Sequence, residues 1–467
     1  GAAPLWKAWA ACTACLRRNF GGMVTLRTCL SAVVLLSVVA NHAECFLAPS
    51  LMGQGVRTWH GESCPRASAH AGASALRCAA NGLGDGEHLL QGLPTVDRRG
   101  VLGGAVLGGM TWALAEPAVA DGLDNLKYKL QDGEIRNVII TGCNSGIGRD
   151  AAAKLVAGGY NVILACRTMN KSIETRDSIL EEVSKVEGMQ RKPTVTAMEC
   201  DLASFKSIRT FASAVINMSI PIDILALNAG LSLATSAKPP PPRTEDGFEL
   251  TVGTNHMGHF LLCNLLIREM AKNKRGARIV VTASQVHDPA SPGGNVGSKA
   301  SLGGMMGLQK GGQWEMVDGG PFDGDKAYKD SKLCNVLFTK ELAKRLNATA
   351  AYRGVSVNCF SPGLITKSGL FRNQGNVFVP VFDFAVNNIF KVGETVSFGG
   401  DCLLTMACDK QLKGVSGAFW SNSKPGKHTF EPVGISVEAQ DGAKAKKLWA
   451  LSVRETKLKS SESPFAS

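Results

Sequence analysis

Tyr328 and Lys332 are the two residues whose types and spacing point most directly to chemistry. They stand four positions apart in the segment YKDSK, so they share one face if that segment is helical. A phenol gives up its proton reluctantly near neutral pH, and a neighbouring ammonium group favours the phenolate. Such a pair can hand a proton to a substrate. Taken alone, however, the spacing fits an exposed helix that carries one tyrosine at least as well as it fits a proton-donating pair.

A glycine-rich turn at 141–148, TGCNSGIG, is the second chemical signal. It follows the β-branched run RNVIIT and opens a helix-like segment. Gly142 allows the tight turn, Gly146 lets the backbone approach a pyrophosphate, and Gly148 lets helix and sheet pack closely. The N-terminus of the following helix would face the phosphates. We therefore predict dinucleotide binding by Gly142, Asn144, Ser145, Gly146, Ile147 and Gly148.

The spacing TGxxxGxG resembles the short-chain dehydrogenases rather than other dinucleotide-binding proteins. Later segments match further motifs of that superfamily in the expected order: a pair that flanks adenine, an NAG motif, and a segment that closes over the nicotinamide. The resemblance implies cofactor binding by Asp201, Leu202, Asn228, Ala229, Gly230, Pro362, Gly363 and Thr366.

The same resemblance implies two partners for the Tyr-Lys pair. Ser284 ends the strand-like run ARIVVTA, and Asn255 lies in the segment GTNH. The family roles of this serine and asparagine are to polarise the substrate and to support a proton-relay water near the lysine, which also holds the nicotinamide ribose. The predicted catalytic residues are Tyr328, Lys332, Asn255 and Ser284, and the first two are also expected to contact the cofactor.

Arg167, at the end of the second strand-like run, indicates which dinucleotide is bound. NAD-dependent enzymes commonly carry an acid there for the ribose hydroxyls, whereas a cation suits the 2′-phosphate of NADP. We therefore predict NADPH as the cofactor. We predict no metal site, because His256 and His259 lack further ligands in the sequence, and packing or local hydrogen bonding is the better interpretation of both.

A parallel sheet would bring these residues together. From Arg136 onward, β-branched runs alternate with helix-length segments, which is typical of a parallel sheet with helices on both faces. We predict a single Rossmann-type, doubly wound α/β domain at 130–457, followed by a tail at 458–467. The expected strands are 136–141, 161–166, 195–200, 222–227, 277–283, 355–360 and 416–420.

Ser284 and Tyr328 are 44 positions apart, and a loop of such length in a compact domain is usually functional. This insertion resembles that of the light-dependent protochlorophyllide reductases, as do GFELTVGTNHMGHFLL, SGLFR at 368–372 and the segments SGAFWSNSK and AKKLWALS near the end of the chain. The resemblance spans about 134–457. It implies hydride transfer from NADPH to the C17–C18 double bond of protochlorophyllide after light absorption, with Tyr328 as proton donor and Lys332 as its helper.

Three positions depart from that family. Leu364 stands in place of a cysteine in its PGC segment, Leu227 in place of the cysteine of VCNAA, and Ser232 in place of the tyrosine of NAAVY. A leucine cannot donate a proton or hydrogen-bond a pigment carboxylate. Two alternatives therefore stay open: a light-independent NADPH-dependent carbonyl or retinol-type reductase, and a non-catalytic paralogue that binds pigment or NADPH.

The insertion also carries Met305, Met306 and Trp314. These large apolar side chains either line a pocket for a tetrapyrrole, face a membrane or pack in the core, and the sequence does not separate these interpretations.

The formal net charge of +12 is spread along the chain without a polybasic run. This distribution argues against nucleic acid and fits an anionic membrane surface or an acidic ligand better. Eight of the 14 cysteines follow residue 120, none in a metal-binding spacing, which fits reduced thiols. We predict peripheral contact with a plastid membrane, and assembly into a homo-oligomer stays open.

The first 120 residues resemble targeting sequence. Residues 1–22 are interpreted as upstream or leader sequence, and 23–45 have the basic start and apolar run of a signal peptide. Residues 46–120 continue as a plastid transit region that ends in a twin arginine, a Gly-rich apolar run and an A-x-A site, typical of thylakoid transfer signals. This order resembles the bipartite presequence of algae with complex plastids. We predict a plastid protein on the stromal side, associated with the thylakoid membrane.

Overall fold

The computed structural model describes residues 123, 126–131, 133–186, 192–234, 237–370 and 382–465. The targeting segments predicted at 1–22, 23–45 and 46–120 lie outside these residues, as does the end of the SGLFR segment. None of the helices in the described ranges is both long enough and apolar enough to cross a membrane.

Within the described ranges, eight strands form one sheet in the order β3-β2-β1-β4-β5-β6-β7-β8. All neighbouring strands are parallel except β7 and β8. The seven predicted strands are confirmed as β1 to β7, whereas β8 has only two residues and no alternation that could have revealed it. The bounds are β1 Asn137–Thr141, β2 Asn161–Cys166, β3 Val195–Glu199, β4 Ile224–Leu227, β5 Ala277–Thr282, β6 Val355–Ser361, β7 Phe419–Ser421 and β8 Glu431–Pro432.

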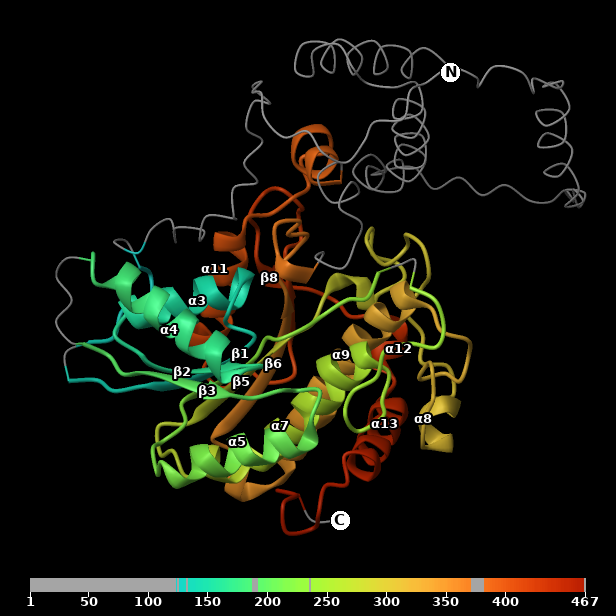
Figure 1. Cartoon of the computed structure of the whole chain (residues 1–467), viewed down its shortest axis with the longest axis horizontal. Coiled ribbons are helices and arrows are strands. Elements are labelled where there is room, and N and C mark those ends of the chain that lie inside the picture. Colours follow the sequence, from blue (N-terminus) through green and yellow to red (C-terminus); the bar gives the residue numbers. More distant parts are fainter. Residues whose placement is uncertain are drawn as a thin grey trace, which may run out of the picture. The chain divides into compact units, whose positions relative to one another are not determined.

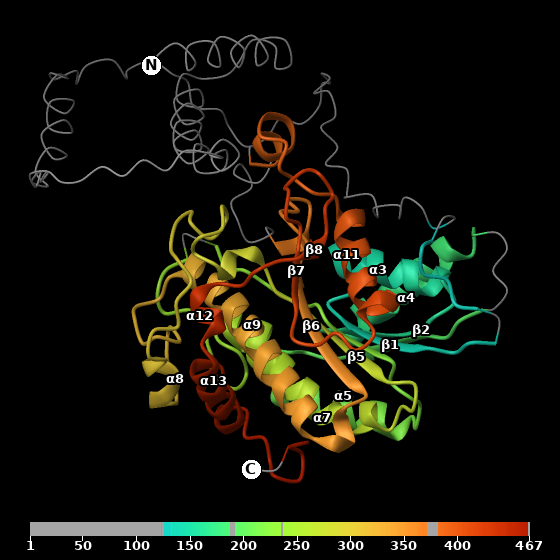
Figure 2. The same ribbon diagram turned by 180° about the vertical axis from the view of Figure 1, so that it is seen from behind.

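Helices cover both faces of the sheet, as predicted for a doubly wound α/β domain (Figure 1). The helices α3, α4 and α11 pack on one face, and α5, α7 and α9 pack on the other, with α13 outside α9 (Figure 2). Because both faces are covered, the central strands β1 and β4 are buried along their whole length rather than alternating between buried and exposed residues. The α-helices of the domain are α3 Gly146–Ala157, α4 Met169–Val183, α5 Phe205–Asn217, α6 Leu250–Val252, α7 His259–Ala271, α8 Met306–Lys310, α9 Gly324–Ala348, α11 Val396–Cys408, α12 Val437–Gln440 and α13 Gly442–Glu455.

Shorter helical turns connect these elements. The π-helical turns are η2 Gly253–Gly258 and η6 Ala385–Ile389, and the 3₁₀ turns are η3 Gln285–His287, η4 Ala350–Tyr352 and η7 Lys410–Leu412. Of these, η2 bears directly on the site, because it carries Asn255 between α6 and α7. Single π turns inside helices are rare and frequently occur at functional sites.

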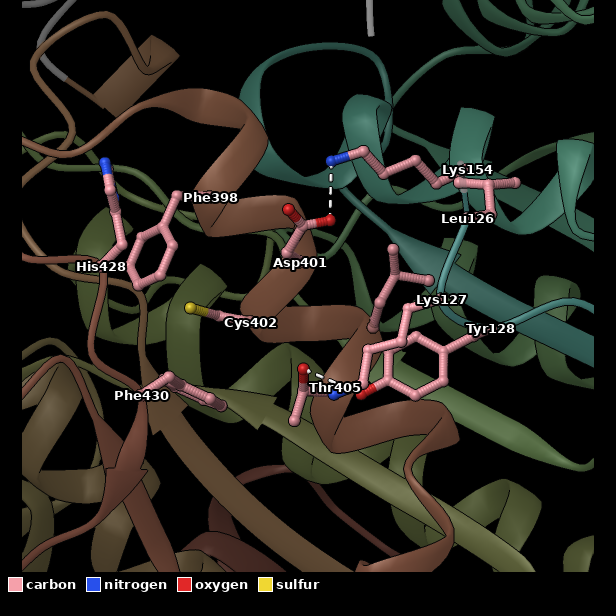
Figure 3. Close-up of a pocket in the computed structure, with 11 residues that line it drawn as sticks. Leu126, Lys127, Tyr128, Lys154, Phe398, Asp401, Cys402, Thr405, His428 and Phe430 are labelled. Carbon is pink, nitrogen blue, oxygen red and sulfur yellow. Dashed lines mark hydrogen bonds and ion pairs between the residues drawn. The ribbon is translucent and has the colours of Figure 1, made fainter. Parts of the chain in front are cut away.

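The segment before β1 packs against the outer side of α11. The hydroxyl of Tyr128 donates to Thr405 Oγ1 (3.2 Å) and to Asp409 Oδ2 (2.9 Å). Figure 3 shows Tyr128 and Thr405 among the residues that line a cavity of about 450 Å³. Lys154, on its opposite wall, is bonded to Asp401 at 2.8 Å. None of the site residues predicted from the sequence lines this cavity.

The long insertion, residues 285–323, is held against the first turns of α9 by buried polar contacts. Lys329 Nζ donates to the carbonyl oxygens of Val296 and Ser298. One residue further along α9, Asp330 accepts from the backbone N–H of Ser301 at 2.9 Å. The helix that carries Tyr328 and the insertion therefore form one packed unit.

The insertion also contributes to the hydrophobic core. Met305 and Trp314 are 1% and 4% exposed and belong to the larger core cluster, whereas Met306 is 62% exposed. Of the three interpretations left open by the sequence, core packing therefore holds for Met305 and Trp314.

The contact between Lys329 and the insertion gives a first prediction. Lys329→Met leaves two carbonyl groups without their charged donor, so the free energy of unfolding should fall by about 1–3 kcal/mol. Backbone amides of residues 293–300 should exchange with deuterium faster, as followed by mass spectrometry. Lys344→Met, an exposed substitution on the same helix, is the control. Equal exchange in the two variants would show that Lys329 does not hold the insertion.

Candidate active site

A cavity of about 960 Å³ opens at the carboxyl edge of the parallel strands, where the strand order reverses between β1 and β4. Ligands of open α/β sheets bind at such a point. The cavity brings together most of the residues predicted from the sequence. Those that line it are Gly142, Asn144, Ser145, Gly146, Ile147, Gly148, Arg167, Asp201, Leu202, Asn228, Ala229, Gly230, Ser284, Tyr328, Lys332, Pro362 and Gly363.

The glycine-rich turn between β1 and α3 is packed so tightly that side chains are excluded at two positions. Gly142 has φ +64, and a Cβ there would lie 2.6 Å from Cα of Ala229. A Cβ on Gly148 would lie 2.4 Å from the carbonyl oxygen of Gly142. The side chain of Ser145 makes no capping hydrogen bond, so the first N–H groups of α3 remain available at the cavity. This cradle fits the pyrophosphate of a dinucleotide.

Asn228 holds the cradle in place from the end of β4. Its Nδ2 donates to the carbonyl oxygens of Thr141 (3.1 Å) and Gly142 (3.3 Å), and its Oδ1 accepts from the hydroxyl of Thr282 (3.2 Å). The side chain thus joins the ends of β1, β4 and β5. The NAG motif therefore has a structural task in addition to its predicted contact with the cofactor.

Arg167 lies at the rim of the cavity, directly after β2. Its side chain is exposed and forms no ion pair with any residue that the structure describes. Lys171, which also lines the cavity, is four residues further along the chain. Two cations at this rim suit the 2′-phosphate that distinguishes NADP from NAD.

Tyr328 and Lys332 lie on the same face of α9, as the spacing predicted. Lys332 Nζ lies 5.5 Å from the centroid of the Tyr328 ring and donates to the carbonyl oxygen of Thr282 at 3.1 Å. Asp323 caps this helix by accepting from the backbone N–H of Lys326 (3.0 Å), which fixes the turn that presents Tyr328.

Burial sets the protonation of this pair. Desolvation raises the pKa of Tyr328 above that of a free phenol, and a hydrogen bond with the Ser284 side chain lowers it in part. Desolvation also lowers the pKa of Lys332 to about 8. The sequence predicted that the ammonium group would favour the phenolate, but in the structure burial has the larger effect on the tyrosine. The phenol is therefore protonated at neutral pH and able to donate.

Asn255 does not line the cavity and lies buried behind its wall. Its side-chain amide bonds both backbone groups of Leu231 at 2.9 Å, and Nδ2 also donates to Ser331 Oγ at 3.0 Å. Only Gly230 separates it from the lysine: a Cβ there would lie 3.5 Å from Lys332 Nζ and 3.6 Å from Asn255 Oδ1. The asparagine therefore ties the loop after β4 to α9.

Thr366 is the other predicted residue that does not line the cavity. Its hydroxyl donates to the carboxylate of Asp383 and its oxygen accepts from Asn387 (3.2 Å). Its predicted contact with the cofactor stays a prediction. Conversely, Thr282 was not predicted, although its carbonyl oxygen receives Lys332. Its position two residues before Ser284, at the end of a predicted strand, was the available signal.

The cavity continues beyond the cofactor-binding turn toward the insertion. Val296, Ser298 and Phe322 line this part from the insertion, and Leu364 and Phe390 line it from the segments after β6. Ser232 lies in the same wall. Two of the three positions that depart from the family pattern thus line the same cavity as Tyr328, whereas Leu227 is buried within β4.

Comparison with known proteins agrees with this geometry. A family model described as short chain dehydrogenase matches residues 136–319. The chain is 38% identical to a protochlorophyllide reductase of Marchantia paleacea, over 68% of this chain and 67% of that one. It is 37% identical to that of Cucumis sativus, over 73% and 82%. The crystal structure of an uncharacterised protein from Mycobacterium paratuberculosis superposes with a TM-score of 0.50 at 27% identity, covering 72% of this chain and 97% of that one.

The sheet, the glycine-rich turn and the Tyr-Lys pair define an oxidoreductase of the short-chain dehydrogenase class, with a cleft that fits NADPH. Within that class, the chain belongs to the protochlorophyllide reductase family.

Arg167 gives a prediction about cofactor choice. Arg167→Ala should weaken NADPH binding about tenfold to a hundredfold, because a hydrogen bond to a charged group contributes about 1.5–3 kcal/mol. NADH, which lacks the 2′-phosphate, should bind as before. Titration of cofactor fluorescence measures both affinities. Arg176→Ala, at a cation paired with Asp177 on α4, is the control. An equal loss for NADPH and NADH would contradict the assignment.

Proposed function

We propose that this chain reduces protochlorophyllide to chlorophyllide in a plastid, in a light-dependent and NADPH-dependent reaction of chlorophyll biosynthesis. The observation that carries the proposal is one continuous cavity. The glycine-rich turn, residues of the insertion, Tyr328 and Lys332 all line it. Relatives that match 68% and 73% of this chain are named chloroplastic protochlorophyllide reductases.

The reaction adds a hydride and a proton across the C17–C18 double bond of the pigment after the pigment absorbs light. The glycine-rich turn and Arg167 would hold NADPH, which would supply the hydride. Tyr328 gives the proton to the other carbon, and its phenol is protonated at neutral pH because burial raises its pKa. Ser284, whose side chain hydrogen-bonds the phenol, orients it toward the pigment. Lys332 stabilises the phenolate that remains and holds the nicotinamide ribose.

Asn255 does not line the cavity, so it acts through the residues that it bonds. Its side chain fixes Leu231 and Ser331, the latter one residue before Lys332. The resemblance to short-chain dehydrogenases assigns to it the support of a proton-relay water near the lysine, through which Tyr328 would regain its proton.

A light-independent reductase is the second candidate, and Leu364 and Ser232 favour it. Both line the cavity that Tyr328 also lines, and neither offers the thiol or phenol that the family carries at these positions. A dark enzyme would bind a carbonyl substrate such as a retinal in the same space, with the same Tyr-Lys pair.

One experiment separates these functions. The full chain is incubated with NADPH and protochlorophyllide, and absorbance spectra are recorded in darkness and after a flash. The proposal expects loss of protochlorophyllide and formation of chlorophyllide only after the flash. Conversion in darkness would remove the light requirement. Failure to convert in light, together with dark turnover of a retinal, would favour the carbonyl reductase, and no turnover of either substrate would favour the non-catalytic paralogue.

Tyr328→Phe tests the proton donor. We expect flash-induced reduction to fall by about a hundredfold or more, the range of general-acid catalysis, while NADPH binding stays unchanged. Tyr352→Phe removes a hydroxyl that bonds Pro464 far from the cavity-lining residues and should leave reduction intact. Undiminished reduction by Tyr328→Phe would disprove the acid role.

The protonation of Lys332 predicts a pH dependence. Burial lowers its pKa to about 8, so the group is charged below that pH and loses its charge above it. Because the charged form stabilises the phenolate, the rate of reduction should fall as the pH rises through about 8. Single-flash conversion measured across a pH series, with circular dichroism to verify folding, checks this. A rate that stays flat well above this pH would contradict it.

We propose a plastid location on the stromal side with peripheral contact to the thylakoid membrane. The curated relatives are named chloroplastic, and the excess of basic residues suits an anionic surface. Fractionation of plastids tests the contact: recovery of the protein only in the soluble fraction at low salt would contradict it. The same fractions, analysed by size-exclusion chromatography, would show whether the protein forms a homo-oligomer.

A further inference from the structure

His259 links the cofactor-binding turn to the π turn that carries Asn255. It is the first residue of α7 and is only 1% exposed. Its Nδ1 lies 3.0 Å from the carbonyl oxygen of Asn255, and its Nε2 lies 3.0 Å from Thr141 Oγ1. One imidazole ring thus bonds residues on two segments that are separated by more than a hundred positions in the chain.

The positions of the protons in this contact follow from the partners. Burial lowers the pKa of His259 to about 3, so the ring is neutral and carries one N–H. The carbonyl oxygen of Asn255 can only accept, which places the proton on Nδ1 and leaves Nε2 as an acceptor. Thr141 Oγ1 already accepts from the backbone N–H groups of Asn228 (2.9 Å) and Ala229 (3.0 Å). Its own proton has two acceptors in reach, His259 Nε2 at 3.0 Å and the carbonyl oxygen of Ala226 at 3.3 Å, and the imidazole nitrogen is the nearer.

The contacts continue from Asn255 to the catalytic helix. Asn255 Nδ2 donates to Ser331 Oγ at 3.0 Å, and Ser331 Oγ donates to the carbonyl oxygen of Tyr328 at 2.6 Å. The contacts therefore lead from Thr141 through His259 to the backbone carbonyl of Asn255, and from the side chain of Asn255 through Ser331 to the backbone of Tyr328. These contacts connect the glycine-rich turn, which is predicted to bind the cofactor, to the turn of α9 that carries Tyr328.

We propose that His259 is a positioning residue that sets the orientation of Asn255 and, through Ser331, of Tyr328 relative to the cofactor-binding turn. The role in reduction rests on the proposed function. His259 does not line the cavity, so it does not touch the reacting atoms. An apolar side chain of similar size would fill its place in the core but would leave the Asn255 carbonyl and the Thr141 hydroxyl without this partner.

The chain itself suggests the matched variants. Asn264, on the same helix, donates from Nδ2 to the carbonyl oxygen of Phe260 at 2.8 Å, four residues earlier. His259→Asn should make the same bond to Asn255 and lose only the contact with Thr141. His259→Leu loses both contacts. Asn264→Ala removes a buried hydrogen bond of the same kind outside the connected set and serves as the control.

The first measurement is deuterium exchange of the backbone amides of residues 328–333, which needs no substrate. His259→Leu should raise this exchange at least about tenfold, the effect of losing about 1.4 kcal/mol of local stability. His259→Asn should restore most of the protection, and Asn264→Ala should leave this segment unchanged. Equal protection in His259→Leu and the wild type would overturn the proposal.

The second measurement is the flash-induced rate per enzyme molecule with NADPH bound. A purely structural role would lower the melting temperature or the affinity for NADPH without changing this rate. We expect His259→Leu to lower it about tenfold or more and His259→Asn to recover most of it. If His259→Leu does not fold, Ser331→Ala interrupts the same set of bonds and should lower the rate alike. A wild-type rate in folded His259→Leu or Ser331→Ala overturns the proposal.

The two measurements separate this proposal from the proposed function. If the wild-type chain converts no protochlorophyllide in light, the proposed function fails, and the exchange of residues 328–333 still decides whether His259 positions the Tyr328 turn.

Discussion

The candidate active site depends on the contacts of one buried ammonium group, that of Lys332. Lys332 is 3% exposed, and its Nζ bonds the carbonyl oxygen of Thr282 and lies near the ring of Tyr328. Neither partner is a carboxylate, so the charge is only partly compensated and burial lowers its pKa to about 8. A carboxylate partner would have compensated the positive charge of Lys332 more completely. Because the positive charge of Lys332 is only partly compensated, another hydrogen-bond acceptor, such as a ribose hydroxyl or a phenolate, can stabilise it further.

Several features of the fold are explained by this contact. The end of β5 must turn its Thr282 carbonyl toward α9, and Asn335 of the same helix reaches that oxygen at 3.3 Å. Gly230 packs beside the same ammonium group, since a Cβ there would be in van der Waals contact with Lys332 Nζ at 3.5 Å. The insertion packs against the start of α9 through Lys329, whose Nζ donates to the carbonyl oxygen of Ser298. Burial thus sets the protonation of both the tyrosine and the lysine.

The sequence predicted the features that arise from local chemistry. Alternating apolar runs and helix-length segments gave the parallel sheet, and the spacing of Gly142 and Gly148 gave the cradle, because only glycine fits there. The sequence could not predict the π turn of η2, which directs the Asn255 side chain toward Leu231 and Ser331 instead of the cavity. That direction depends on long-range packing against α9.

Other features of the structure could not be predicted from the sequence, again because they depend on long-range packing. The insertion has no apolar periodicity, so the burial of Met305 and Trp314 and the exposure of Met306 are decided by contacts with distant elements. His259 could be recognised as a residue for packing or hydrogen bonding, but its partner Thr141 precedes it by 118 positions. Hydrogen bonds across such separations follow from the fold and leave no local pattern.

The positions at which this chain departs from the family pattern reduce the number of side chains that can donate the proton to the substrate. Leu364 and Ser232 line the same cavity as Tyr328, whereas the glycine-rich turn and Arg167 keep the pattern of the superfamily. These substitutions therefore alter the wall of the pigment space and leave the cofactor cradle intact. A leucine has no proton to give. Under the proposed function, proton delivery in this chain therefore depends on Tyr328, and the orientation of its phenol by Ser284 and by the turn that carries it becomes the deciding geometric requirement.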